Sequence, residues 1–147
     1  MSDVIQMIGC LFASALFALL FRTPARLIAP ASMTAVLGYA LSLWAGAELG
    51  AEWLGIFLGS LVAALVGEVL ATRLRAPATI FLTVAIIPLV PGAGLYNTML
   101  ALVQGRSADA ASAGSSTILA AGGIALGLSI AASAAYAVRR MKRGKQQ

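Results

Sequence analysis

A stretch rich in proline and glycine interrupts an otherwise apolar part of the chain, and it holds the residues best suited to bind a ligand. Pro88 and Pro91 lie within residues 86–99, and Gly92 and Gly94 follow them. Proline lacks the amide donor and clashes with the preceding turn, so a helix through this stretch cannot complete its hydrogen bonds. In hydrocarbon such a backbone is tolerated only where it faces protein or a wet cavity. The stretch therefore predicts a broken transmembrane helix on a transport path.

The half-helix that follows the break would offer a site for an anion, most naturally a carboxylate. We expect it to begin within residues 92–95 and to direct free amides and the positive end of its dipole into the gap. The carbonyls of Val84 and Ile87, which lose their donors to the prolines, could meet an ammonium group. The predicted substrate-binding residues are Pro88, Pro91, Gly92, Gly94, Tyr96, Asn97 and Thr98. The alternative is a proline kink that only shapes the bundle.

The depth of the break follows from helix length. Residues 77–88 would form about 17 Å of helix, which reaches the middle of a hydrocarbon core about 30 Å thick. The sequence therefore predicts a break near mid-membrane.

Glu68 is the one acidic residue expected inside a span, about one turn from its end. It could be a proton acceptor or a contact for a substrate ammonium group. The structural alternative is a carboxylate that reaches the interface or pairs with Arg73, Arg75 or a cation from a neighbouring helix. Glu48 and Glu52 are interpreted as solvated loop charges.

Composition predicts an all-α integral membrane protein. Of the 147 residues, 61% are hydrophobic and 10% are charged, far from the average of soluble proteins. The apolar blocks predict one transmembrane domain, residues 1–147, with about five helices, the fourth broken at the Pro-x-x-Pro-Gly motif. The expected spans are residues 4–21, 27–44, 53–72, 78–104 with an interruption near 88–92, and 115–138. Residues 106–114 are expected to form a loop, and residues 139–147 a basic cytoplasmic tail.

The distribution of positive charge predicts an orientation. In this five-span arrangement nine of the ten Lys and Arg residues fall on one side, leaving Arg106 alone on the other. Because Lys and Arg concentrate in cytoplasmic loops, the amino terminus is expected outside and the carboxy terminus in the cytoplasm.

Small residues recur every four positions in three of the predicted spans. The third span carries Gly55, Gly59, Ala63, Gly67 and Ala71; the second Thr34, Gly38 and Ser42; and the fifth Gly123 and Gly127. Such ridges let helix backbones approach closely, which predicts ordinary membrane-helix contacts. A bundle that rocks along these thin ridges is the functional alternative.

Several function classes are disfavoured. The chain has no His and no Ser in a catalytic context, so we expect no enzyme activity. It also lacks a phosphate-binding Gly-rich loop with Lys, so transport would be driven by a gradient or be passive. Cys10 is the single cysteine, and we predict no metal site and no cofactor. The basic residues lie at the ends of apolar blocks, which argues against a nucleic-acid partner and for contact with the lipid bilayer.

Residues 87–99, with Pro-x-x-Pro-Gly followed by Tyr and Met, together with residues 67–71 and 76–79, resemble the threonine/serine exporter family. The resemblance is closest to its carboxy-terminal membrane domain, which in many bacteria is a separate small protein, and it is best from Glu52 and Trp53 onward. It implies a subunit of the bacterial cytoplasmic (inner) membrane that works with a larger membrane partner carrying the amino-terminal half of the exporter. It also implies small carboxylated substrates, either threonine and serine or dicarboxylates such as succinate.

These observations favour a subunit of a secondary-active exporter of small carboxylated metabolites. One alternative is a structural membrane subunit that stabilises the larger partner without transporting. Another is a homo-oligomeric channel.

Overall fold

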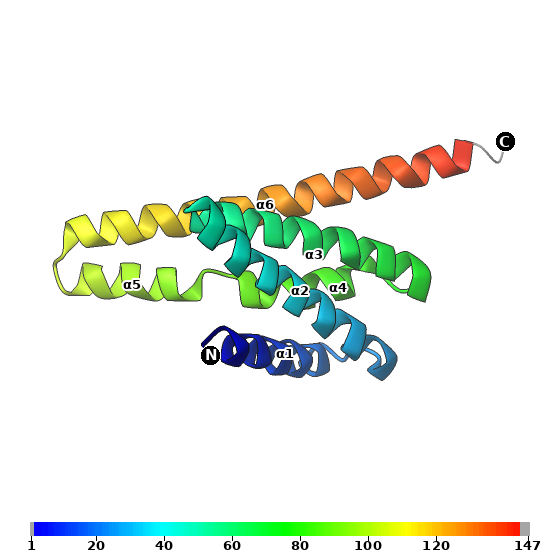
Figure 1. Ribbon diagram of the computed structural model, residues 1–147, viewed down its shortest axis with the longest axis horizontal. Coiled ribbons are helices and arrows are strands. Elements are labelled where there is room, and N and C mark those ends of the chain that lie inside the picture. The colour runs from blue at the N-terminus through cyan, green and yellow to red at the C-terminus, as the bar shows by residue number, and fades with distance from the viewer. Residues whose placement is uncertain (1, 145–147) are drawn as a thin grey trace.

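The computed structural model describes residues 2–144, and side chains for residues 4–141. Over this range the chain is helical and contains no strand. The elements in order are α1 (Ser2–Leu20), α2 (Ala25–Leu49), α3 (Glu52–Leu74), α4 (Ala78–Ile86), the 3₁₀ turn η1 (Ile87–Leu89), α5 (Gly92–Val103) and α6 (Ser107–Gly144) (Figure 1). The all-α architecture predicted from composition is thus confirmed for the described residues.

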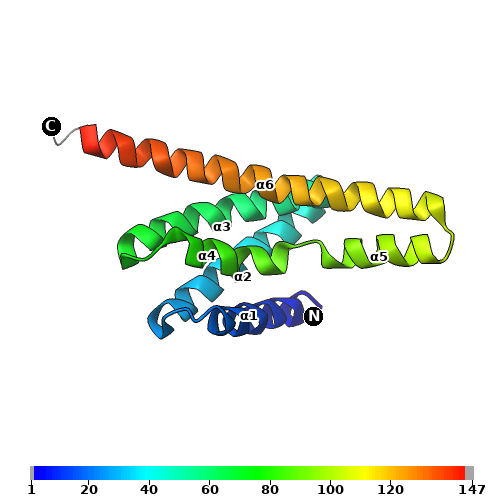
Figure 2. The same ribbon diagram turned by 180° about the vertical axis from the view of Figure 1, so that it is seen from behind.

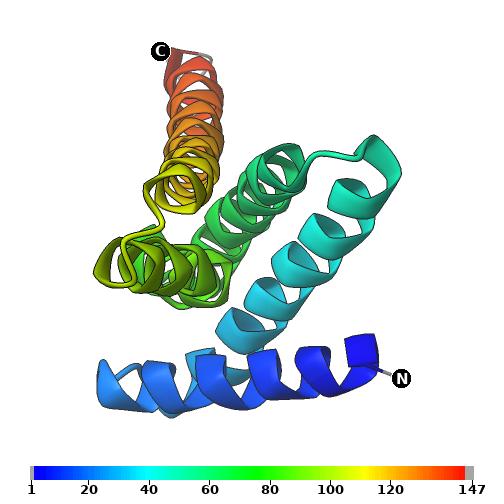
Figure 3. The ribbon, with the colours of Figure 1, turned by 90° about the vertical axis from the view of Figure 1, so that its left-hand side faces the viewer.

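Three helices are long and apolar enough to cross a membrane: α2, α3 and the Ser107–Met141 part of α6. The bent pair Ala78–Leu89 and Gly92–Val103 would make a fourth if it is one span. The apolar part of α1, Val4–Leu20, is shorter, and Figure 3 shows α1 inclined to α3 and α6, on the far side of the bundle from α6. The chain is a multi-pass membrane protein, and the five-span count stays a prediction.

The loop predicted over residues 106–114 is wrong. The connection to α6 is a short turn at Gly105, whose φ of +71° glycine adopts without strain, and helix begins at Ser107. Arg106 and Asp109 form an ion pair of 2.8 Å across the first turn, where a carboxylate also favours the helix dipole. The Ser and Gly residues suggested a loop, but alanines interleave with them and alanine is the strongest helix former. At the other end, residues 139–144 of the predicted tail continue α6, while residues 145–147 lie outside the described residues.

The predicted small-residue ridges are confirmed as helix contacts. On α3, Gly59 faces Gly38 and Ser42 of α2 so closely that a Cβ would lie 2.8 Å from the Ser42 Cβ, and nearer still to the Gly38 carbonyl. A Cβ on Gly123 of α6 would lie 3.0 Å from the carbonyl oxygen of Trp53. The helix α3 therefore packs backbone to backbone against α2 on one side and α6 on another.

We expect Gly59→Ala to destabilise the protein. The new methyl group would meet backbone and Cβ atoms that cannot rotate away, and overpacking of this kind costs about 1–3 kcal/mol. Gly122→Ala is the matched control, because a Cβ there meets nothing within 4 Å. Thermal unfolding in detergent should show a lower midpoint for Gly59→Ala only. Equal midpoints for both variants would contradict the close packing of α2 and α3.

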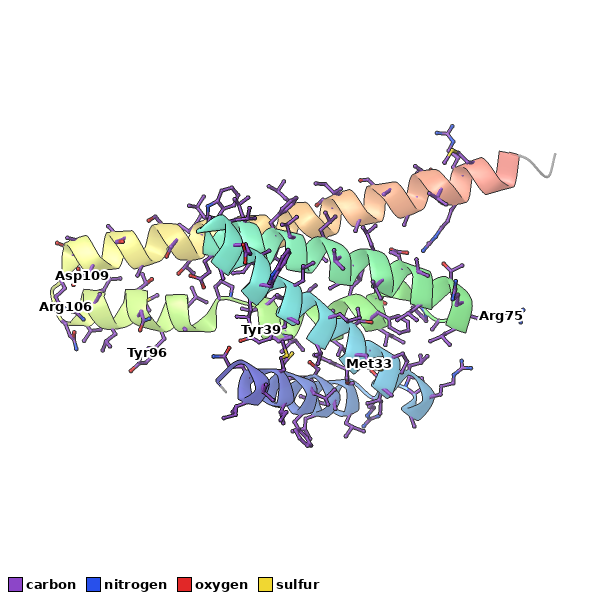
Figure 4. The ribbon with its side chains drawn as sticks, in the orientation of Figure 1. Met33, Tyr39, Arg75, Tyr96, Arg106 and Asp109 are labelled. Atoms are coloured by element: carbon purple, nitrogen blue, oxygen red, sulfur yellow. The ribbon has the colours of Figure 1, made fainter. Side chains whose placement is uncertain are left out.

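The hairpin of α5 and the beginning of α6 projects beyond the ends of α1, α2 and α3 (Figures 1 and 2). α5 packs mainly against α6. Arg106 and Asp109 lie at the tip of this hairpin, and Arg75 lies at the opposite end of the bundle (Figure 4). The break between α4 and α5 thus lies where the hairpin leaves the main bundle.

Candidate functional site

The backbone leaves the α-helical path between Ile86 and Gly92. The residues of η1 tighten into a 3₁₀ turn, Val90 is extended at φ −61° and ψ 127°, and the helices on either side are bent by 44°. An extended Val90 is what Pro91 imposes on the residue before it. The interruption therefore lies over the Pro-x-x-Pro-Gly motif.

Hydrogen bonds within the break correct one expectation. The Val90 amide donates to the carbonyls of Ile86 and Ile87, at 3.2 and 3.4 Å, so the Ile87 carbonyl has a donor within the break and is not left without one. The Gly92 amide donates to the Val90 carbonyl at 2.7 Å. A helix leaves its first amides without intrahelical acceptors, so Ala93 and Gly94 supply the remaining donors of the first turn of α5.

A pocket of about 380 Å³ opens beside the break. Its walls come from α2, α3, α6 and the segment that links η1 to α5. Four of the predicted binding residues, Pro88, Pro91, Gly92 and Gly94, line it together with Ser42, Glu52, Trp53 and Thr117. The broken backbone thus faces a cavity that also exposes polar side chains.

The two glycines of the pocket differ in their surroundings. A Cβ on Gly94 would collide with the Thr117 hydroxyl of α6, so a bare backbone is needed there for the hairpin to close. A Cβ on Gly92 would meet nothing within 4 Å. The amide end of α5 is therefore held tightly at Gly94 and is open at Gly92.

Two hydroxyl groups in the pocket already donate hydrogen bonds to backbone carbonyls. Ser42 donates to the Tyr39 carbonyl and Thr117 to the Ala113 carbonyl, each at 2.7 Å. A hydroxyl whose proton is used can still accept through its oxygen. The pocket therefore combines backbone donors on α5 with acceptors on α2 and α6.

Tyr96, Asn97 and Thr98 do not line this pocket. Tyr96 is 66% exposed and points away from α6, and Asn97 is exposed on the same helix. Thr98 is half-buried; its hydroxyl donates to the Gly94 carbonyl at 2.7 Å. The structure thus brings the prolines and glycines to the pocket and turns Tyr96 and Asn97 toward the surroundings.

The residue that sequence reasoning missed is Glu52. It was interpreted as a solvated loop charge, but it is the first residue of α3 and lines the pocket next to Trp53. The pocket thus places the break beside this first turn of α3, and the depth of the break in the membrane stays a prediction. No local pattern in the sequence brings Glu52 to the break, because the two meet only through the packing of helices.

Glu68 lies far from this pocket and is paired. Its carboxylate accepts from the Arg139 guanidinium of α6, and the Glu68 side chain is 13% exposed. Of the partners considered from the sequence, the cation of a neighbouring helix is the one observed. A role for Glu68 in binding protons or ammonium would require this ion pair to open.

Metal chemistry finds no support among the described residues, since no group of three His, Cys, Asp or Glu side chains comes close enough to hold an ion. Cys10 is buried and unpaired in α1.

Packed apolar helices, a bent helix pair and a polar pocket at its break are typical of helical membrane transport proteins. The chain belongs to the family described as Threonine/Serine exporter, ThrE, whose model matches residues 6–134. This is a family of transporters, which fits the expectation that the chain is not an enzyme. No curated protein and no solved structure matched the chain.

Proposed function

We propose that the chain is a subunit of a secondary-active exporter of small carboxylated metabolites and that the pocket at the break is part of the substrate path. The observation that carries this proposal is the pairing of opposite chemistries in one cavity. Amides and the positive dipole end of α5 form one wall, and the Glu52 carboxylate belongs to another. A zwitterion has the matching charges.

The substrate carboxylate would bind at the first turn of α5. The amides of Ala93 and Gly94 are the available donors, and the open space beside Gly92 lets a ligand approach the backbone. Its ammonium group would then lie toward Glu52, with the oxygens of Ser42 and Thr117 as further acceptors. This arrangement favours threonine-like and serine-like amino acids over dicarboxylates, because Glu52 would repel a second carboxylate.

A larger membrane subunit would complete the pocket. Supporting this, α5 projects past the other helices with large apolar side chains exposed: Leu95, Tyr96, Met99, Leu102 and Val103. A partner packed along this face would cover them and would bring its own groups to Tyr96 and Asn97. The predicted roles of Tyr96, Asn97 and Thr98 therefore belong to the assembled exporter.

We infer that the chain is a single transmembrane domain in the bacterial cytoplasmic membrane, with the amino terminus outside. The arginine-rich end of the bundle would face the cytoplasm, because Lys and Arg concentrate there. In this orientation the pocket and the α5–α6 hairpin lie toward the outer side.

The alternative of a purely structural subunit has less support. In that alternative the glycine ridges would hold the partner, but Gly38, Gly59 and Gly123 are used within this chain. A homo-oligomeric channel remains the third possibility, since the exposed face of α5 could also bind a second copy.

Measurement of threonine efflux from cells distinguishes the exporter subunit from the structural subunit. Cells preloaded with threonine should export it when this chain and the larger subunit are expressed together, and export should be absent with either one alone. Full export by the larger subunit alone would identify this chain as structural. Conductance from this chain purified by itself would identify a channel and contradict the exporter.

A further inference from the structure

A second pocket lies at the opposite end of the bundle, between the end of α3, the start of α4 and the last turns of α6. Its volume is about 290 Å³, and Thr72, Arg75, Pro77, Ala78 and Arg139 line it. Two arginines, one at the end of α3 and one on α6, thus line one cavity, and none of its lining residues is acidic.

Arg75 is held in place by an unusual backbone. It caps α3 in the left-handed conformation, with φ 51° and ψ 48°, where glycine is the usual residue. The amides of Arg75 and Ala76 both donate to the Ala71 carbonyl, the second at 3.0 Å. Left-handed backbone is costly for a residue with a Cβ, and the two hydrogen bonds to Ala71 help to hold Arg75 in it.

Arg139 approaches the pocket from α6 and is shared with Glu68. Arg139 is 56% exposed, so its guanidinium retains donors beyond those given to Glu68. The Thr72 hydroxyl already donates to the Glu68 carbonyl at 3.0 Å and can act only as an acceptor. The donors of this pocket are therefore the two arginines, aided by the first amides of α4, which has no side-chain cap.

We propose that this pocket binds a small oxyanion, a carboxylate or a phosphate group, through Arg75 and Arg139, and that Glu68 competes with the ligand for Arg139. Guanidinium groups suit this role because their planar fork matches the two oxygens of such an anion. The oxyanion could belong to a free metabolite or to a lipid headgroup. With either source, the Glu68–Arg139 ion pair breaks when the anion binds.

Binding of inorganic phosphate to the purified full chain in phosphatidylcholine nanodiscs tests the site. Arg75→Gln and Arg139→Gln should each weaken binding by about tenfold, as expected for the loss of one charged hydrogen-bonding partner. Arg140→Gln is the matched control, because Arg140 is on the same helix but outside the pocket, and it should bind as the wild type does.

Glu68→Gln distinguishes competition from a structural role. Removal of the competing carboxylate should tighten phosphate binding by about two- to tenfold, the range expected for one partly screened charge pair. Thermal unfolding of each variant checks that it folds. Weaker binding in a folded Glu68→Gln protein, or wild-type binding by both arginine variants, would overturn the proposal.

Lipid composition identifies the source of the oxyanion. Phosphatidylglycerol added to the nanodiscs supplies an anionic headgroup that can compete with inorganic phosphate for the pocket. We expect it to suppress phosphate binding by the wild type and by Arg140→Gln alike, which assigns a lipid headgroup as the occupant; unchanged phosphate binding assigns a soluble anion. No phosphate binding in either lipid would overturn the site.

Discussion

Replacing Gly92 by leucine should reduce threonine export by at least about tenfold, equivalent to about 1.4 kcal/mol of lost substrate binding, while the protein still folds and assembles. A Cβ at Gly92 meets nothing within 4 Å, so the backbone can accept the side chain. The leucine would occupy the open approach to the amides of Ala93 and Gly94. Export from preloaded cells, normalised to the amount of membrane-inserted protein, measures the effect.

Gly122→Leu is the control for this experiment. Gly122 also has open space at its Cβ position, but it lies on α6 outside the pocket. The two substitutions therefore add the same side chain to equally open helical positions. Equal export by both variants and the wild type would contradict the proposed role of the α5 amides.

A substitution at Gly94 is less informative about whether the α5 amides bind the substrate. A side chain there collides with Thr117, so a loss of export would reflect displacement of α5 from α6 as much as a blocked site. This separation of two glycines in one motif depends on the helix that packs against them. The sequence shows the motif but not which glycine touches α6.

Local patterns in the sequence predicted the features that depend on residues close together in the chain. The four-residue spacing of Gly55 and Gly59 predicts close helix packing, and α3 does approach α2 there. The spacing of Pro88 and Pro91 removes donors within one turn, and the helix is interrupted over that turn. In each instance the residues that set the structure lie within a few positions of one another.

Contacts between residues distant in sequence could not be predicted in the same way. Glu68 pairs with Arg139, 71 positions later, and no residue near Glu68 in the sequence identifies that partner. Glu52 lines the same pocket as Pro88 and Pro91 because α3 packs beside the break. The start of α6 packs against α5, a contact that its own composition does not reveal. Helix register and depth therefore determine the site, and they follow from packing of the whole chain.

Glu52, the pocket residue that the sequence did not reveal, should have a large effect on export. Glu52→Gln should lower export of threonine by about tenfold, because a neutral amide replaces the acceptor of a charge-assisted hydrogen bond to the substrate ammonium group. Glu52 is exposed, so water screens the interaction and keeps the loss toward the lower end of that class. Competition between labelled threonine and unlabelled succinate in the same cells measures the change in selectivity.

The direction of the selectivity change is what tests the pairing of charges. With Glu52 present, a dicarboxylate brings a second negative charge against a carboxylate, whereas a zwitterion brings an ammonium group. Neutralising Glu52 removes both the repulsion and the attraction, so succinate should compete better as threonine export falls. Glu48→Gln is the matched control, because Glu48 lies near the end of α2 and does not line the pocket. If Glu52→Gln changed threonine export and succinate competition no more than Glu48→Gln does, the ammonium group would have to bind elsewhere, and the substrate-bound pocket would have to take its acceptors from the partner subunit.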